Sequence, residues 1–78
     1  MPELPRVSGK AAIKVFESLD WESRSIEGSH HVYNKVGCRS ILSIPVHGNK
    51  ELKRGLLRGL IRTAGMTVEE FVDALEQF

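Results

Sequence analysis

This sequence of 78 residues is poor in cysteine and contains no long apolar run. Its single cysteine, Cys38, cannot form an intramolecular disulfide and cannot build an all-cysteine zinc site, which fits a reducing compartment. No apolar run approaches the roughly 20 residues of a transmembrane helix, and the N-terminus lacks the apolar core of a signal peptide. We therefore expect a cytoplasmic protein with no membrane partner.

The size and composition are those of one ordinary globular domain, which we expect to span residues 1–78. The chain is 41% hydrophobic and 27% charged, a balance that argues against disorder. The formal net charge is only +1, but a basic segment, residues 50–62, precedes an acidic one, residues 69–76. This separation predicts a polarised surface.

Three segments in the first half of the chain have the character of β-strands. We predict strands over residues 22–27, 31–36 and 39–46, joined by turns at Gly28-Ser29 and Gly37-Cys38. Strands joined by such short turns favour an antiparallel meander. Pro45 indicates an edge position or the end of the third strand.

Helical patterns flank these strands on both sides. Residues 8–19 are predicted to form an amphipathic helix with Ser8 as its N-cap. A second helix is predicted to begin at the N-cap Asn49 and to stop at Gly65. Thr67, with a glutamate three residues later, has the capping-box pattern that opens a last helix. The predicted fold is therefore α+β, in the order helix, three strands, helix, helix.

The segment Gly28-Ser29-His30-His31-Val32-Tyr33 holds two of the three histidines. Histidine can both accept and donate protons at cellular pH because its unperturbed pKa lies near neutrality. Neighbouring residues on a strand point to opposite faces, so if His30 faces a substrate, His31 has a structural role. His47 follows the third strand and can reach a site at the rim of the sheet. The alternative for each histidine is a plain surface or packing role.

Other chemistries have weaker support around these histidines. No cysteine or carboxylate pattern completes a metal site with them, so we expect no metal and no other cofactor. Ser29 lacks the elbow motif that surrounds a serine nucleophile.

A second feature is the recurrence of a basic residue every four positions in the second predicted helix. Lys50, Arg54, Arg58 and Arg62 would form one stripe along its flank. Like charges at this spacing repel each other, and a polyanion would relieve the repulsion. The stripe is therefore interpreted either as a phosphate-binding surface or as a solvated helix face.

A histidine beside a basic helix is suited to RNA cleavage. RNA carries its own nucleophile, the 2′-hydroxyl, so an enzyme needs a base, an acid and cations near the phosphate, but no metal. Ser29 would orient the imidazole or donate to a phosphate, and Tyr33 would stack on a base or donate a hydrogen bond. Two alternatives are a non-catalytic RNA-binding module and an interaction domain whose basic helix binds an acidic protein.

Several segments in order resemble the HicA (YcfA-like) toxin family. They are residues 4–10 (LPRVSGK), residues 28–33 (GSHHVY), residues 44–47 (IPVH) and the helix predicted from Asn49 to Gly65. The resemblance implies a fold like that of a double-stranded-RNA-binding domain, with helices packed on one face of a three-stranded antiparallel sheet. Asp20 stands where family members often have glycine, and aspartate tolerates the left-handed conformation better than most residues.

The resemblance also implies a function. It implies an mRNA interferase, a toxin endoribonuclease that cleaves messenger RNA, with His30 as its catalytic histidine. It further implies a separate antitoxin, HicB, that binds the toxin and blocks the active site. Supporting roles in RNA binding are expected for Gly28, Ser29, Tyr33, Lys50, Arg54 and Arg58.

Overall fold

The computed structural model describes residues 4–77 and follows the predicted order of elements. In chain order, the helices and strands are α1 (Gly9–Ser18), β1 (Glu22–Glu27), β2 (His30–Asn34), β3 (Ile41–Pro45), α2 (Arg54–Thr63) and α3 (Val68–Leu75). The strands form one antiparallel sheet in the order β1-β2-β3, as the short turns predicted. The α+β prediction is confirmed.

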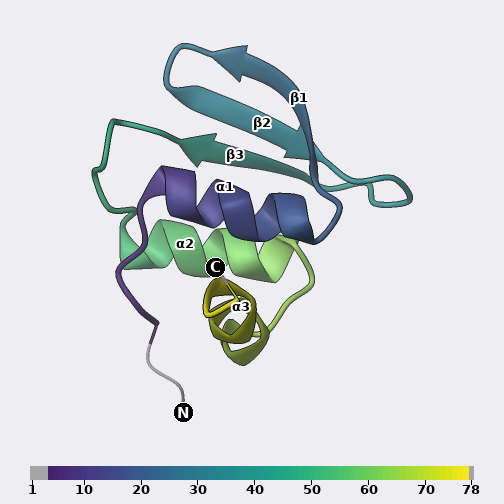
Figure 1. Ribbon diagram of the computed structural model, residues 1–78. Helices are drawn as coiled ribbons and strands as arrows, with labels where there is room; N and C mark the ends of the chain where they lie inside the picture. Colours follow the sequence, from purple (N-terminus) through teal and green to yellow (C-terminus); the bar gives the residue numbers. More distant parts are fainter. Residues whose placement is uncertain (1–3, 78) are drawn as a thin grey trace.

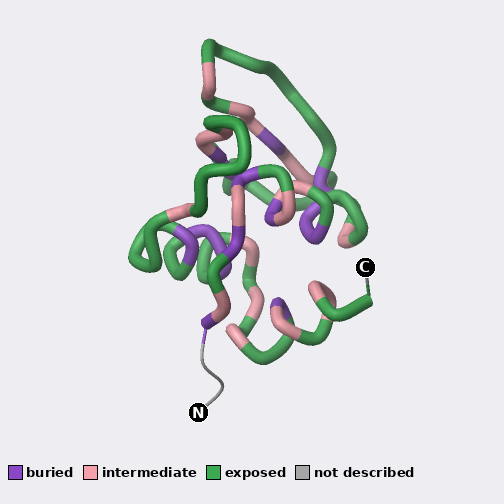
Figure 2. The backbone as a smooth tube through the Cα atoms, turned by 60° about the vertical axis from the view of Figure 1, so that its left-hand side comes forward, coloured by how far each residue is buried: buried purple, intermediate pink, exposed green. Residues whose placement is uncertain are grey.

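The helices lie on one side of the sheet and contact it mainly through β3 (Figure 1). The β1–β2 hairpin reaches beyond them, and every residue of β1 is exposed (Figure 2). Because none of the helices within residues 4–77 covers the opposite face of the sheet, residues of that face are open to a large ligand. In the described part of the chain, no helix is long and apolar enough to cross a membrane.

The core forms between β3 and the helices. Leu42 and Ile44 of β3 are fully buried, whereas Ile41 and Ser43, which alternate with them, are exposed, as the alternation predicted. Phe16 of α1 is also fully buried and packs its ring against those of Trp21 and Phe71. The aromatic contacts thus join α1 to the start of β1 and to α3.

Two of the three predicted helix N-caps, Ser8 and Thr67, form as expected. The Ser8 side chain accepts a hydrogen bond from the backbone N–H of Ala11 at the start of α1. Thr67 and Glu70 form the complete capping box of α3, with each side chain bonded to the other residue's backbone N–H. Asp20, after α1, has a φ of 73°, so it adopts the left-handed conformation that the sequence suggested.

The predicted start of the second helix at Asn49 is wrong. The N-cap of α2 is Lys53, and the preceding segment is extended, because Leu52 N–H donates to the Val7 carbonyl at 2.8 Å. Ser8 and Glu51 form an antiparallel bridge in the same place. These long-range backbone bonds replace the first helical turn. Smaller boundary errors affect β2, predicted over 31–36, and β3, predicted over 39–46.

Candidate active site

His30 is the first residue of β2 and lies on the face of the sheet away from the helices. Tyr33 of the same strand is buried toward the helices, and strand alternation places His30 on the other face of the sheet. The His30 side chain is exposed. His31, the neighbouring residue, is half-buried and pairs with the buried Ile44. The predicted separation of the two histidines onto opposite faces is therefore observed.

The turn before His30 has the backbone geometry of a type II′ hairpin turn. Glu27 pairs with His30, and Gly28 between them has a φ of 61°, a left-handed value that glycine adopts without strain. Ser29 completes the turn with a negative φ. Gly28 therefore has a conformational role here, which places Ser29 and His30 side by side at the end of the hairpin.

The end of β3 brings His47 to this turn. His30 pairs with Pro45, and beyond that pair the Val46 N–H donates to the Ser29 carbonyl at 2.7 Å. One residue later, His47 Nε2 lies 3.5 Å from Ser29 Oγ, at the long end of hydrogen-bonding distance. Ser29 thus lies next to His30 in the chain and next to His47 in space.

The segment after β3 is held in place from three directions. The backbone carbonyl of His47 accepts a hydrogen bond from Lys50 N–H at 3.0 Å, and Leu52 N–H donates to the Val7 carbonyl. On the other side, Gly9 at the start of α1 packs so closely that a Cβ atom there would overlap the Pro45 carbonyl oxygen. The backbone around His47 is therefore built into the fold although its side chain is exposed.

The basic residues do not form the predicted four-residue helical stripe. Lys50 precedes α2 in the extended segment, so only Arg54, Arg58 and Arg62 share the helix. All three are exposed, and Arg54 begins α2 at the end of the molecule that holds the β1–β2 turn (Figure 1). Lys50 instead lines a hollow together with His47.

That hollow, of about 280 Å³, lies next to the end of β3. Pro45, Leu52 and Leu56 supply apolar surface, while Lys50 and Lys53 supply positive charge. Glu51 also lines it, and its carboxylate lies 4.0 Å from the exposed Arg6 guanidinium.

Tyr33 does not belong to this site. Its side chain is only 4% exposed and faces the helices, and its hydroxyl donates to Glu17 Oε2 at 3.3 Å. Burial raises the pKa of the Tyr33 hydroxyl, and the negative charge of Glu17 raises it further. The predicted stacking of Tyr33 on an RNA base is wrong, because the ring is packed in the core.

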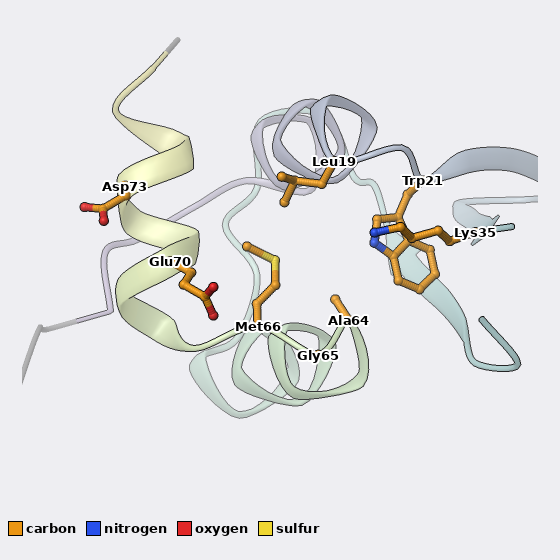
Figure 3. Close-up of a pocket in the computed structure, with 8 residues that line it drawn as sticks. All are labelled: Leu19, Trp21, Lys35, Ala64, Gly65, Met66, Glu70 and Asp73. Carbon is orange, nitrogen blue, oxygen red and sulfur yellow. The ribbon is translucent and has the colours of Figure 1, made fainter. Parts of the chain in front are cut away.

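A larger hollow, of about 420 Å³, lies at the opposite end of the sheet (Figure 3). Leu19, Trp21 and Met66 form its apolar part, while Lys35 stands on one side and Glu70 on the other. It contains no histidine or cysteine. His30 and His47 instead lie at the end of the sheet with the smaller hollow.

Among residues 4–77, no group of three or more His, Cys, Asp or Glu side chains is arranged to hold a metal ion. The described polar groups at this end of the sheet are His30, Ser29 and Glu27 at the turn, and His47, Lys50, Glu51 and Lys53 around the hollow. Such a set can move protons and bind phosphate. From the sequence, His47 was expected to be able to reach the rim of the sheet, because it follows the third strand, but it was given no catalytic role.

A comparison with protein families shows the family of the chain. A family model described as the HicA toxin of bacterial toxin-antitoxin systems matches residues 9–66. The chain belongs to the HicA toxin family. HicA toxins are generally ribonucleases that act on mRNA, and the family implies an antitoxin partner and an RNA target. The match covers the β1–β2 turn, the end of β3 and α2. A comparison with curated proteins gave no match.

Proposed function

We propose that this HicA-family chain is a metal-independent endoribonuclease that cleaves mRNA by acid–base chemistry at His30. The observation that carries the proposal is the position of His30, exposed on the uncovered face of the sheet beside the Gly28-Ser29 turn. An imidazole in that position is accessible to a polymer that a closed pocket would exclude. Histidine also has the pKa best suited to general acid–base catalysis near neutral pH.

Histidine catalysis of RNA cleavage uses the 2′-hydroxyl of the substrate. A base removes the 2′-hydroxyl proton, the 2′-oxygen attacks the adjacent phosphorus, and the bond from phosphorus to the 5′-oxygen breaks. The products are a 2′,3′-cyclic phosphate and a 5′-hydroxyl end. His30 acts as the base or the acid in this step, and Ser29 positions the imidazole or donates to a phosphate oxygen.

The exposed basic side chains around this end supply the binding of the RNA backbone. Lys50 lies in the hollow beside His47, and Arg54 and Arg58 follow on α2. Each contact with a phosphate releases a counterion, so affinity is expected to fall as salt rises. The protein partner that family membership supports is an antitoxin of the HicB type.

The test is cleavage of a defined mRNA by the purified wild-type chain and by His30→Ala, each with and without EDTA. The wild type is expected to cleave equally well with EDTA and to leave 2′,3′-cyclic phosphate ends. His30→Ala is expected to lose at least about 100-fold in rate, the lower range for loss of a general acid or base. Because His30 is exposed, its replacement should leave the thermal unfolding midpoint unchanged.

Equal cleavage by the two proteins would remove His30 from the mechanism. Salt-dependent RNA binding without cleavage by either protein would instead identify a non-catalytic RNA-binding module. Absence of RNA affinity at low salt would favour the interaction-domain alternative.

A further inference from the structure

Cleavage of RNA without a metal needs two proton transfers, one from the 2′-hydroxyl and one to the departing 5′-oxygen. His30 can make only one of them in a single step. We propose that His47 is the second proton-transfer group, so that the site is a pair of histidines contributed by the start of β2 and the end of β3. This inference rests on the proposed ribonuclease function and adds a catalytic residue to it.

The first support is the register of the sheet. The register brings β2 and β3 together up to the residue before His47. His30 pairs with Pro45, and the next residue, Val46, donates its backbone N–H to Ser29. The His47 imidazole then reaches the Ser29 hydroxyl, with 3.5 Å between Nε2 and Oγ. The two histidines are 17 positions apart in the chain, yet both border on Ser29.

The second support is that the backbone of His47 is fixed and its imidazole is accessible. Three contacts hold this segment: the Val46–Ser29 bond, the Leu52–Val7 bond and the close packing of Gly9 on Pro45. A catalytic group gains from such a fixed frame because proton transfer requires the donor within hydrogen-bond reach of the reacting oxygen. All three contacts join residues that are distant in the chain, so the fold as a whole fixes the position of this segment.

The third support is the hollow beside His47. Its two lysines, Lys50 and Lys53, can attract a phosphate, and Pro45 and Leu56 offer apolar surface against which a nucleotide base can lie. Leu56 is 40% exposed, so its side chain is accessible to such a base. An RNA strand seated there has a phosphate next to His47.

The principal rival is Glu27, which pairs with His30 across the hairpin and is exposed. The Glu27 carboxylate is suited to the role of the base, whereas histidine can serve either as the acid or as the base. The other charged groups at His47 are Lys50, Glu51 and Lys53.

During cleavage, one imidazole gains a proton and the other loses one. The neutral histidine takes the 2′-hydroxyl proton as the bond from the 2′-oxygen to phosphorus forms. The protonated histidine gives its proton to the 5′-oxygen as the bond from phosphorus to that oxygen breaks. Neither an oxidant nor a metal enters this balance, and the pair ends with the protons exchanged.

The experiment compares the pH dependence of kcat/KM for the wild type, His47→Gln and Glu27→Gln on one short RNA. Glutamine can keep the contact with Ser29 Oγ but cannot transfer a proton at neutral pH. The wild type is expected to show a bell-shaped profile, which reports one base and one acid. His47→Gln is expected to lose at least about 100-fold at the optimum and to lose one limb of the bell.

A second substrate separates proton transfer from binding. In this substrate, sulfur replaces the bridging 5′-oxygen, and the thiolate leaves without receiving a proton. The variant that lacks the acid therefore recovers its cleavage rate on this substrate, whereas the variant that lacks the base does not. One of His30→Ala and His47→Ala is expected to recover. His31→Gln is the matched control: it removes a histidine from the opposite face and should keep the full bell.

Each contrary result has a distinct meaning. If His47→Gln keeps the wild-type profile, or if it loses rate uniformly with both limbs intact, His47 transfers no proton and the inference is wrong. Loss of a limb in Glu27→Gln instead would assign the second role to Glu27. If the wild type does not cleave RNA at all, the proposed function fails and this inference fails with it.

Discussion

Replacing Gly9 with alanine tests how the fold positions the end of β3. Gly9 is the first residue of α1 and is buried. A Cβ atom at this position would overlap the Pro45 carbonyl oxygen and would lie 3.2 Å from Val46 Cγ2. Because a carbonyl oxygen belongs to the backbone, it cannot rotate away, so either α1 or β3 must move.

The size of the effect follows from two opposed contributions. Overpacking of a well-packed site typically costs about 1–3 kcal/mol. Alanine recovers part of this, since a glycine inside a helix costs about 0.5–1 kcal/mol relative to alanine. A net loss of about 1–2 kcal/mol is therefore expected. For a domain of this size, that loss lowers the midpoint of thermal unfolding by about 4–16 °C.

The same substitution at Gly59 is the matched control. Gly59 is exposed in the middle of α2, and a Cβ atom there would meet no heavy atom within 4 Å. Gly59→Ala is therefore expected to stabilise the protein by about 0.5–1 kcal/mol, the opposite sign. Circular dichroism during heating measures the unfolding midpoints of both variants. A Gly9→Ala protein as stable as the wild type would refute the close approach of α1 to Pro45.

Two further predictions concern the core tyrosine and the basic helix. Because the folded protein raises the pKa of Tyr33 above its ordinary 10.0, that residue's contribution to stability is fully present below pH 10 and is lost as the pH rises through the folded pKa. Denaturant unfolding between neutral and strongly alkaline pH should show this loss in the wild type and less of it in Tyr33→Phe; equal pH dependence would contradict the assignment. Arg58→Ala is expected to weaken RNA binding and to reduce the slope of log affinity against log salt by about 0.7, the value for one phosphate on a single strand. Arg39→Ala, at the opposite end of the sheet, is its control, and an equal change in both variants would argue against a specific role for Arg58.

Features set by neighbouring residues in the chain were predictable. The alternation of a strand separated His30 from His31, because successive side chains of a strand point to opposite faces. The side chains of Ser8 and Thr67 identified the helix starts, because they bond to N–H groups only three residues away. Aspartate at position 20 indicated the left-handed turn that ends α1.

The errors arose where a local pattern met a distant partner. Asn49 has the side chain of an N-cap, and the apolar spacing after it is helical, but Leu52 and Glu51 pair with residues 7 and 8 instead. Backbone bonds to the N-terminal segment outweighed the local preference. Tyr33 resembled a surface aromatic in sequence, and only packing against α1 showed its ring to be buried and its hydroxyl bonded to Glu17.

The sequence by itself determined the α+β order, the placement of His30 and His31 on opposite faces and the basic character of the second helix. Those properties depend on side-chain periodicity and charge, which are written along the chain. Only the tertiary structure decided that His47 meets Ser29 and that Lys50 lies beside His47. Both contacts depend on strand register and on the bonds that hold the segment after β3, and neither can be seen without the distant residues that make them.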